Sequence, residues 1–317
     1  MKILVTGASG FVGHQLIQTL KQRYCLKVIA IGRSVLQSCA DEFFVVSNFD
    51  QQGVWQEPLE GCDVVIHLAA RVHVMHDRAE DPLEAFLAVN LHGTVNLANA
   101  AAKAGVKRFV YVSSIKVNGE YTEGQPFTAQ DAPNPQDPYA VSKWRAEQAL
   151  LKLSEETGME VVIVRPPLVY GPGVKANFAS LLNVVNKRLP LPLSCINNTR
   201  SMIYVGNLAD ALITCATHAN AAGQTYLVCD NENVSTPQLI KKLAFVLKRP
   251  YLVFPFPLSI MRLLARLVAK SSAVDRLTQS LVIDCSTLCN ELDWEPPFTM
   301  QEGLLETAQW YIESVKK

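Results

Sequence analysis

The sequence predicts an α/β fold in which a doubly wound parallel sheet is followed by a smaller C-terminal lobe. Short runs rich in Val, Ile and Leu alternate with longer helical patterns through the first half of the chain. Such near-continuous apolar runs are typical of strands that are buried on both faces of a parallel sheet. A glycine-rich turn joins the first run directly to the first helical pattern. This alternation predicts right-handed crossovers, with helices on both sheet faces.

Five apolar runs of the first half are predicted strands: Ile3–Thr6, Lys27–Ile31, Val64–Leu68, Phe109–Ser113 and Val161–Arg165. The helices predicted between them are Val12–Gln22, Pro82–Ala104 and Tyr139–Glu156. Further on, prolines and glycines interrupt the pattern, and the predicted elements are helices at Asn207–Thr217 and Thr236–Leu247 and a strand at Thr225–Cys229. We expect one domain over residues 1–165 and a smaller lobe over residues 166–317, interleaved with the last sheet strands at about 200–230.

Length and composition indicate a compact globular protein. Of 317 residues, 49% are hydrophobic and 18% are charged, which excludes disorder. Lys plus Arg number 29, as do Asp plus Glu, so the net charge offers no electrostatic case for nucleic acid or an anionic membrane. No uncharged apolar run reaches the about 18 residues of a membrane span. The most membrane-like stretch, Phe254–Val268, contains two arginines and is predicted to be an amphipathic helix over a cleft.

The eight cysteines form no CxxC pair, and no His lies at zinc-ligand spacing, so no metal site is expected. Most of them lie in apolar runs, which predicts buried reduced thiols. Because Met1-Lys2 leads directly into an apolar strand, no signal peptide is expected either. Together these features predict a cytoplasmic protein.

The turn after the first predicted strand carries glycines with the spacing G-x-x-G-x-x-G. In a strand–turn–helix context this pattern predicts a Rossmann-type dinucleotide site, with the pyrophosphate at the helix N-terminus. Gly7 permits the tight turn, Gly10 lets the backbone approach the phosphates, and Gly13 lets the helix pack on the strand. The cofactor contacts predicted here are Gly7, Ser9, Gly10, Phe11, Val12 and Gly13.

Arg33 follows the second predicted strand, where NAD-preferring sites carry an acidic residue for the ribose 2′-hydroxyl. A guanidinium there can pair with the 2′-phosphate of NADP and stack on adenine. The alternative is an arginine that is simply solvated. The expected cofactor is NADP or NAD, with NADP favoured.

A catalytic set is predicted at Ser114, Tyr139 and Lys143. Tyr139-Ala-Val-Ser-Lys143 places Tyr and Lys at i and i+4, on one face of a helix. A nearby ammonium and the positive nicotinamide of an oxidised cofactor lower the pKa of a phenol. The phenol could then exchange a proton with a substrate oxygen while nicotinamide exchanges hydride. Ser114 closes a predicted parallel strand, and such strand ends are where doubly wound folds place their active sites.

These motifs resemble the extended short-chain dehydrogenase/reductase family, the NAD(P)-dependent nucleotide-sugar epimerases, dehydratases and reductases. The resemblance covers nearly the whole chain. Further family marks are Ser113–Gly119, His67-Leu68-Ala69-Ala70, Asn90 before Gly93-Thr94, Arg165-Pro166, and Tyr170–Gly173. The spacing from Gly119 to Tyr139 matches the nucleotide-sugar 4-epimerases and so selects Ser114 over Ser113 as the catalytic hydroxyl. The resemblance also implies that Lys143 holds the nicotinamide ribose, that Leu68, Ala69, Ala70 and Pro166 contact the cofactor, and that the protein is a homodimer through the helices Pro82–Ala104 and Tyr139–Glu156.

On the substrate side, Arg200 lies in a segment that resembles the family segment whose arginine grips the diphosphate of a UDP-sugar. By the same resemblance, Asn177 and Arg276 are candidate contacts to the sugar diphosphate. Each could instead be an ordinary surface residue. His73 and His76 could line the sugar pocket, but no catalytic role is assigned to them.

Two departures from the family narrow the chemistry. Sugar-nucleotide 4,6-dehydratases carry Thr-Asp-Glu where this chain has Ser114-Ile115-Lys116, which argues against a dehydratase. Asn118 replaces the usual Tyr of a V-Y-G segment, which puts part of the substrate contact in question.

The function expected first is a 4-keto reductase of a UDP-4-keto-6-deoxy-N-acetylhexosamine in surface polysaccharide synthesis, because three long segments resemble such reductases. The alternative is a 4-epimerase of UDP-glucose or UDP-N-acetylglucosamine. A remote alternative is an inactive NAD(P)-binding regulator.

Overall fold

The computed structural model describes residues 1–34, 39–49, 51, 53–72, 81–267 and 271–316. The main sheet contains seven parallel strands in the order β3-β2-β1-β4-β5-β6-β9. Their bounds are β1 Lys2–Thr6, β2 Lys27–Gly32, β3 Glu42–Val45, β4 Val64–His67, β5 Arg108–Val112, β6 Glu160–Arg165 and β9 Thr225–Leu227. The predicted doubly wound Rossmann fold is confirmed, and strand order reverses between β1 and β4, where such sheets bind ligands.

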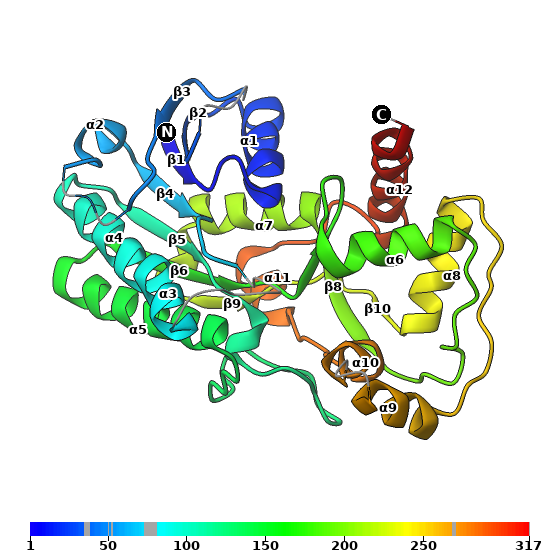
Figure 1. Ribbon diagram of the computed structural model, residues 1–317. Helices are drawn as coiled ribbons and strands as arrows, with labels where there is room; N and C mark the ends of the chain where they lie inside the picture. The colour runs from blue at the N-terminus through cyan, green and yellow to red at the C-terminus, as the bar shows by residue number, and fades with distance from the viewer. Residues whose placement is uncertain (35–38, 50, 52, 73–80, 268–270, 317) are drawn as a thin grey trace.

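Helices cover both faces of this sheet (Figure 1). One face packs on α1 (Phe11–Arg23), α7 (Val205–Thr217) and α11 (Ser286–Leu292). The opposite face packs on α2 (Gln56–Leu59), α4 (Thr94–Lys103) and α5 (Pro138–Thr157). The strands contribute core residues to both clusters, which explains their continuous apolar sequences.

The predicted helix Pro82–Ala104 contains an irregularity. It divides into α3 (Pro82–Leu87), a π-helical turn η1 (Ala88–Gly93) and α4. A π-turn adds a residue to the helical repeat and is frequent at functional sites. Here it carries Asn90, whose side chain is fully buried.

A second, three-stranded sheet has the order β10-β8-β7, from β7 (Leu168–Tyr170), β8 (Arg200–Tyr204) and β10 (Asn233–Val234). Its core includes α6 (Ala176–Asn186), α8 (Thr236–Val246) and α12 (Met300–Lys316). α9 (Leu258–Leu267) and α10 (Ser271–Thr278) follow α8 in the chain, at the lower right of Figure 1.

Between the two sheets the chain crosses back and forth. After β8 it returns to the main sheet through α7, and β9 then pairs with β6 in the register Ile163↔Thr225. Short 3-10 helices lie at η2 (Ile115–Val117) and η3 (Ala219–Ala221). The division of the chain at residue 165 into two domains stays a prediction.

Candidate active site

The glycine loop connects β1 to α1. At two of its glycines, Gly7 and Gly13, the surrounding backbone leaves no space for a side chain. A Cβ at Gly13 would lie 2.2 Å from the Gly7 carbonyl oxygen. Gly7 has φ +68°, and a Cβ there would lie 2.9 Å from the Ala69 nitrogen. A Cβ at Gly10 would meet the Gly7 carbonyl at 3.0 Å and is otherwise clear of the described residues. The loop is therefore closed toward the sheet and open above Gly10.

This open side coincides with the N-terminus of α1. Gly10 is the N-cap, it supplies no side-chain hydrogen bond, and the first turn contains no acidic residue. The backbone N–H groups and the positive end of the helix dipole favour an anion here. Of the other predicted contacts in this loop, Ser9 is exposed, and Phe11 and Val12 are half-buried. Phe11 lies beneath the loop after β7, because a Cβ at Gly173 would lie 3.3 Å from its ring.

The loop after β4, Leu68-Ala69-Ala70, is fastened to the end of β1. The Thr6 Oγ1 lies 3.2 Å from both the Leu68 and the Ala69 backbone nitrogen. Thr6 Oγ1 also lies 2.7 Å from Nδ1 of the buried His67. On the other side of the ring, Nε2 lies 2.9 Å from Thr94 Oγ1.

His67 is neutral in this setting. Burial lowers its pKa to about 3, and the charge of Lys143 acts in the same direction. Thr94 in turn donates its hydroxyl to the Asn90 carbonyl at 2.8 Å. A continuous set of hydrogen bonds thus connects the glycine loop with the π-helical turn.

Asn90 connects that turn to the catalytic helix. Its Oδ1 accepts from the Arg71 backbone nitrogen at 2.8 Å, and its Nδ2 donates to the Ser142 Oγ at 2.9 Å. Ser142 donates to the Tyr139 carbonyl at 2.7 Å. The family pattern in the sequence marks Asn90 as a notable residue. It does not reveal that Asn90 positions the first turn of α5, because that role depends on a contact with Ser142, which is distant in the sequence.

Ser114, Tyr139 and Lys143 lie together at the carboxyl end of β5. Ser114 follows the strand and is the N-cap of η2, and Tyr139 is in the first turn of α5. Asp137 caps this helix by accepting from the Ala140 nitrogen at 2.7 Å. Burial raises the pKa of Tyr139 to about 12, and a hydrogen bond with the Ser114 side chain opposes that rise. The chain's own residues therefore raise this pKa, since burial outweighs the other influences. The lowering expected from an oxidised nicotinamide stays a prediction.

Lys143 turns toward the strand end. Its Nζ donates to the Val112 carbonyl at 2.8 Å and lies 4.6 Å from the centre of the Tyr111 ring. Only 2% of Lys143 is exposed, and burial lowers its pKa to about 7, while the charge of Glu147 opposes this shift. Glu147 lies one turn further along α5.

A buried ion pair anchors α5 to β6. Arg165 donates to the Glu147 carboxylate from Nε at 3.0 Å and from Nη2 at 2.5 Å. A third bond runs from Arg165 Nη1 to the Asn118 Oδ1 at 3.0 Å, and Asn118 Nδ2 donates to the Thr128 carbonyl at 2.9 Å. Exposure is 4% or less for all three side chains of this cluster. Asn118, at the position where the family carries Tyr, thus has a structural role.

The positions that distinguish dehydratases carry no carboxylate. Ile115 is buried, and the Lys116 ammonium contacts the carboxylates of Asp137 at 2.6 Å and Glu120 at 2.8 Å. Lys116 therefore stabilises the N-cap of α5 instead of supplying a base. Pro166 is buried, and its carbonyl accepts from the Ile115 nitrogen at 3.0 Å.

The predicted substrate residues are only partly brought together. Arg200 donates from Nη1 to the backbone carbonyls of Arg276 at 3.0 Å and Gln279 at 3.1 Å. Burial lowers the Arg200 pKa, and Glu120 opposes this. The side chains of Arg276, Asn177 and Arg33 are exposed. Arg33 directly follows β2, as predicted, whereas His73 and His76 lie outside the described residues.

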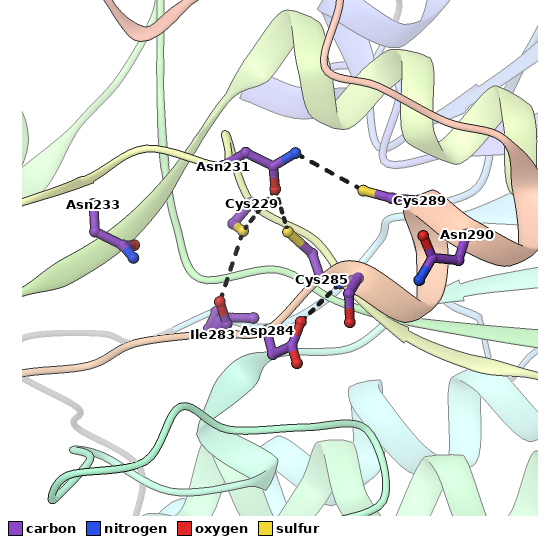
Figure 2. A pocket seen from close by; sticks show the side chains of 9 residues that line it. Cys229, Asn231, Asn233, Ile283, Asp284, Cys285, Cys289 and Asn290 are labelled. Carbon is purple, nitrogen blue, oxygen red and sulfur yellow. Dashed lines mark hydrogen bonds between the residues drawn. The ribbon is translucent and has the colours of Figure 1, made fainter.

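A separate pocket of about 310 Å³ follows β9, and the sequence did not predict it. Figure 2 shows Cys229, Cys285 and Cys289 around Asn231, whose Oδ1 lies 2.7 Å from the Cys285 sulfur. The cysteines of the chain are free, and Cys25, Cys39 and Cys195 are exposed, in contrast to the expected burial. Within the described ranges, no group of three His, Cys, Asp or Glu side chains could hold a metal ion.

Taken together, the doubly wound sheet, the glycine loop at its switch point and the Ser–Tyr–Lys set define an extended short-chain dehydrogenase/reductase. Residues 3–229 match the NAD dependent epimerase/dehydratase family, and the chain belongs to that family.

Known proteins are similar along the full length of the chain. It is 44% identical to a UDP-glucose 4-epimerase of Vibrio cholerae, over 98% of this chain and 96% of that protein. Among solved structures, a Thermus thermophilus UDP-glucose 4-epimerase in complex with NAD is 25% identical, with TM-score 0.78 and coverage of 98% and 99%. MoeE5 in complex with UDP-glucose and NAD has TM-score 0.80 at 23% identity, covering 99% of this chain and all of that one, and supports the fold.

Proposed function

We propose that this protein is a 4-epimerase of a UDP-hexose that works with a retained NAD. The observation that carries the proposal is the full-length similarity to the Vibrio cholerae UDP-glucose 4-epimerase. The catalytic set contains the groups that epimerisation at C4 requires, and the dehydratase carboxylates are replaced by Ile115 and Lys116.

The residues around the glycine loop fit a dinucleotide. The open space above Gly10 and the uncapped N-terminus of α1 suit a pyrophosphate, and the Leu68–Ala70 loop borders the same switch point. When bound, NAD would accept hydride from C4 of the sugar and return it to the opposite face.

In this proposal the chain's own residues handle the C4 oxygen. Tyr139 exchanges the proton of the C4 hydroxyl, and Ser114, its hydrogen-bonding neighbour, holds the same oxygen. Lys143 lies at the end of β5, where its ammonium would hold the nicotinamide ribose when NAD is bound. Asn90 and Ser142 keep the first turn of α5 in place while the proton moves.

The decisive experiment supplies UDP-glucose or UDP-N-acetylglucosamine to the purified enzyme without added cofactor. An epimerase returns its hydride to the substrate, so we expect C4 inversion to equilibrium, followed by NMR of the sugar. Enzyme stripped of nucleotide and then given NAD is the matched control. Absence of inversion in both preparations would contradict the proposal.

A second candidate, the 4-keto reductase expected first from the sequence, is favoured by one observation. Arg33 is exposed directly after β2, and a guanidinium is a suitable partner for the 2′-phosphate of NADP. This enzyme would consume NADPH stoichiometrically with a UDP-4-keto-6-deoxy-N-acetylhexosamine. Such consumption, without inversion of the simple UDP-sugars, would replace the epimerase with the reductase.

Gly13→Ala is expected to weaken dinucleotide binding by about tenfold or more, because its Cβ would lie 2.2 Å from the Gly7 carbonyl oxygen and force the loop apart. The measurement is the affinity of stripped enzyme for NAD by calorimetry. His14→Ala, an exposed neighbour on the same helix, should bind NAD normally. Equal affinities of the two variants would show that the loop does not hold the cofactor.

Arg200→Ala is expected to raise KM for the UDP-sugar much more than it lowers kcat. A diphosphate clamp remote from C4 stabilises ground and transition states about equally. Arg200 also holds the backbone carbonyls of Arg276, in the last turn of α10, and of Gln279, just after it. Arg276→Ala is therefore the matched comparison, because it removes the second candidate guanidinium and keeps the carbonyl that Arg200 contacts. Loss confined to kcat in Arg200→Ala would exclude the clamp.

The protein is also proposed to be a homodimer through α3, η1, α4 and α5. Their outer surface leaves Val89 38% and Leu151 37% exposed, as expected for helices that pack against a second copy.

A further inference from the structure

The second lobe carries an exposed face built from three segments. Residues 251–254 run beside residues 189–191, joined by hydrogen bonds from the Leu191 nitrogen to the Leu252 carbonyl at 2.9 Å and from the Phe254 nitrogen to the Leu191 carbonyl at 3.0 Å. α9 begins four residues after Phe254 and lies at the bottom of the lobe in Figure 1. We call these segments, with α9, the α9 face.

Large apolar side chains are exposed on the α9 face. Six of them are between 40% and 59% exposed: Leu189, Tyr251, Leu252, Phe254, Ile260 and Leu263. On α9 itself, Met261 packs against the lobe core, whereas Ile260 and Leu263 are exposed. Soluble monomers rarely expose many large apolar residues together unless the surface binds something.

The same face is basic. Its segments, residues 187–194 and 251–267, contain four Lys and Arg and no Asp or Glu. Four exposed basic side chains belong to the α9 face or border it: Lys187, Arg188, Arg262 and Arg266. The chain has no net charge, but basic residues without acidic ones gather in these segments. The net charge of the whole chain therefore does not describe how this surface interacts with an anionic membrane.

We propose that the α9 face docks on an anionic lipid surface. An amphipathic helix with aromatic and aliphatic residues beside Lys and Arg is the pattern of helices that lie in the membrane interface. Basic residues attract anionic headgroups, while the apolar side chains enter the acyl boundary. Pairing with a second copy would bring identical basic clusters together, which repel. The docking is peripheral, because no helix within the described ranges is long and apolar enough to cross a bilayer.

The test is co-sedimentation of the full chain with vesicles. We expect binding to phosphatidylcholine vesicles that contain about a third phosphatidylglycerol, little binding to pure phosphatidylcholine, and weaker binding as salt rises. Absence of binding to the anionic vesicles at low salt would overturn the proposal, as would equal binding to both kinds of vesicle.

Two variants separate the contributions of charge and apolar area. Arg262→Glu with Arg266→Glu, and separately Ile260→Glu with Leu263→Glu, should each weaken partitioning at least about tenfold. The matched controls are Lys27→Glu with Lys107→Glu, and Val45→Glu, at exposed positions elsewhere. If both α9 variants bind like wild type, the face does not dock on lipid. If they bind lipid normally but change the mass seen by light scattering, the face joins two copies instead.

The proposal is independent of the epimerase assignment, because the α9 variants should retain activity on a soluble UDP-sugar. That activity, with the thermal midpoint, also shows that the variants are folded, so lost lipid binding can be assigned to the face. Should the apolar pair unfold the lobe, the arginine pair still decides the outcome, since both guanidinium groups are exposed.

Discussion

Tyr139→Phe is expected to abolish turnover while NAD binding survives. The phenol hydroxyl is the one group assigned to move the C4 proton, and general acid–base groups contribute about 10²–10⁴-fold. The ring remains packed edge-on against Phe86, with centroids 6.0 Å apart, so the variant should fold normally. The measurements are kcat for epimerisation and the NAD content of the purified protein.

Two comparisons sharpen this prediction. Ser114→Ala should lose less activity, because Ser114 orients the oxygen without transferring its proton. Tyr121→Phe changes a 40% exposed tyrosine and should be indistinguishable from wild type. Near-normal kcat in Tyr139→Phe would remove the tyrosine from the mechanism, and a fully active Ser114→Ala would direct attention to Ser113.

Glu147→Ala is expected to destabilise the fold by about 3–5 kcal/mol, because it leaves the buried Arg165 guanidinium without its anion. Arg165 would keep only its bond to Asn118 from this cluster. The same change removes the charge that opposes the lowering of the Lys143 pKa, so the ammonium should lose its proton more readily. Urea unfolding with a linear extrapolation measures the stability.

The control for this variant is Glu156→Ala, on the same helix. Glu156 pairs with Lys152 at 3.7 Å on the surface, and such exposed pairs contribute about 0–1 kcal/mol. Replacing Glu147 and Arg165 together by Leu and Met should recover much of the loss, since paired apolar substitutes avoid the buried charge. Equal stabilities of Glu147→Ala and Glu156→Ala would show that the buried pair does not stabilise the fold.

Local sequence signals predicted the first half of the fold well. The strands that become β1, β2, β4, β5 and β6 stand out because their burial on both faces requires continuous apolar residues. β3 was missed, since its four residues Glu42–Val45 are only partly buried at the sheet edge. The π-helical turn was also missed, because it depends on hydrogen bonds from Asn90 to Arg71 and Ser142 and not on local helical periodicity.

In the candidate site, too, features set by neighbouring residues could be predicted, and features set by distant residues could not. The glycine loop and Tyr139-x-x-x-Lys143 could be found because their geometry is set within one turn or one helix. The partners of Arg165 and Arg200 could not, because they come from distant elements. Epimerase and reductase could not be separated either, since both act at C4 with the same Ser, Tyr and Lys.

The donors and acceptors in the hydrogen bonds around His67 can be assigned in only one way. The Thr94 hydroxyl proton is used on the Asn90 carbonyl, so Thr94 can only accept from Nε2, which must carry the ring proton. With a pKa of about 3 the ring stays neutral at physiological pH, and Nδ1 must accept from the Thr6 hydroxyl.

The Thr6 oxygen is then left to accept the two amide protons of Leu68 and Ala69. Every proton along this row points away from the Leu68–Ala70 loop, and the last one points to the Asn90 carbonyl in the π-helical turn. This row of hydrogen bonds orients the Leu68–Ala70 loop. The tautomer of His67 is set at the far end of the row, by the Thr94 hydroxyl beside the π-helical turn. Moving the ring proton of His67 from Nε2 to Nδ1 would require every donor and acceptor in the row to exchange roles. The backbone N–H groups of Leu68 and Ala69 cannot do this, because they can only donate.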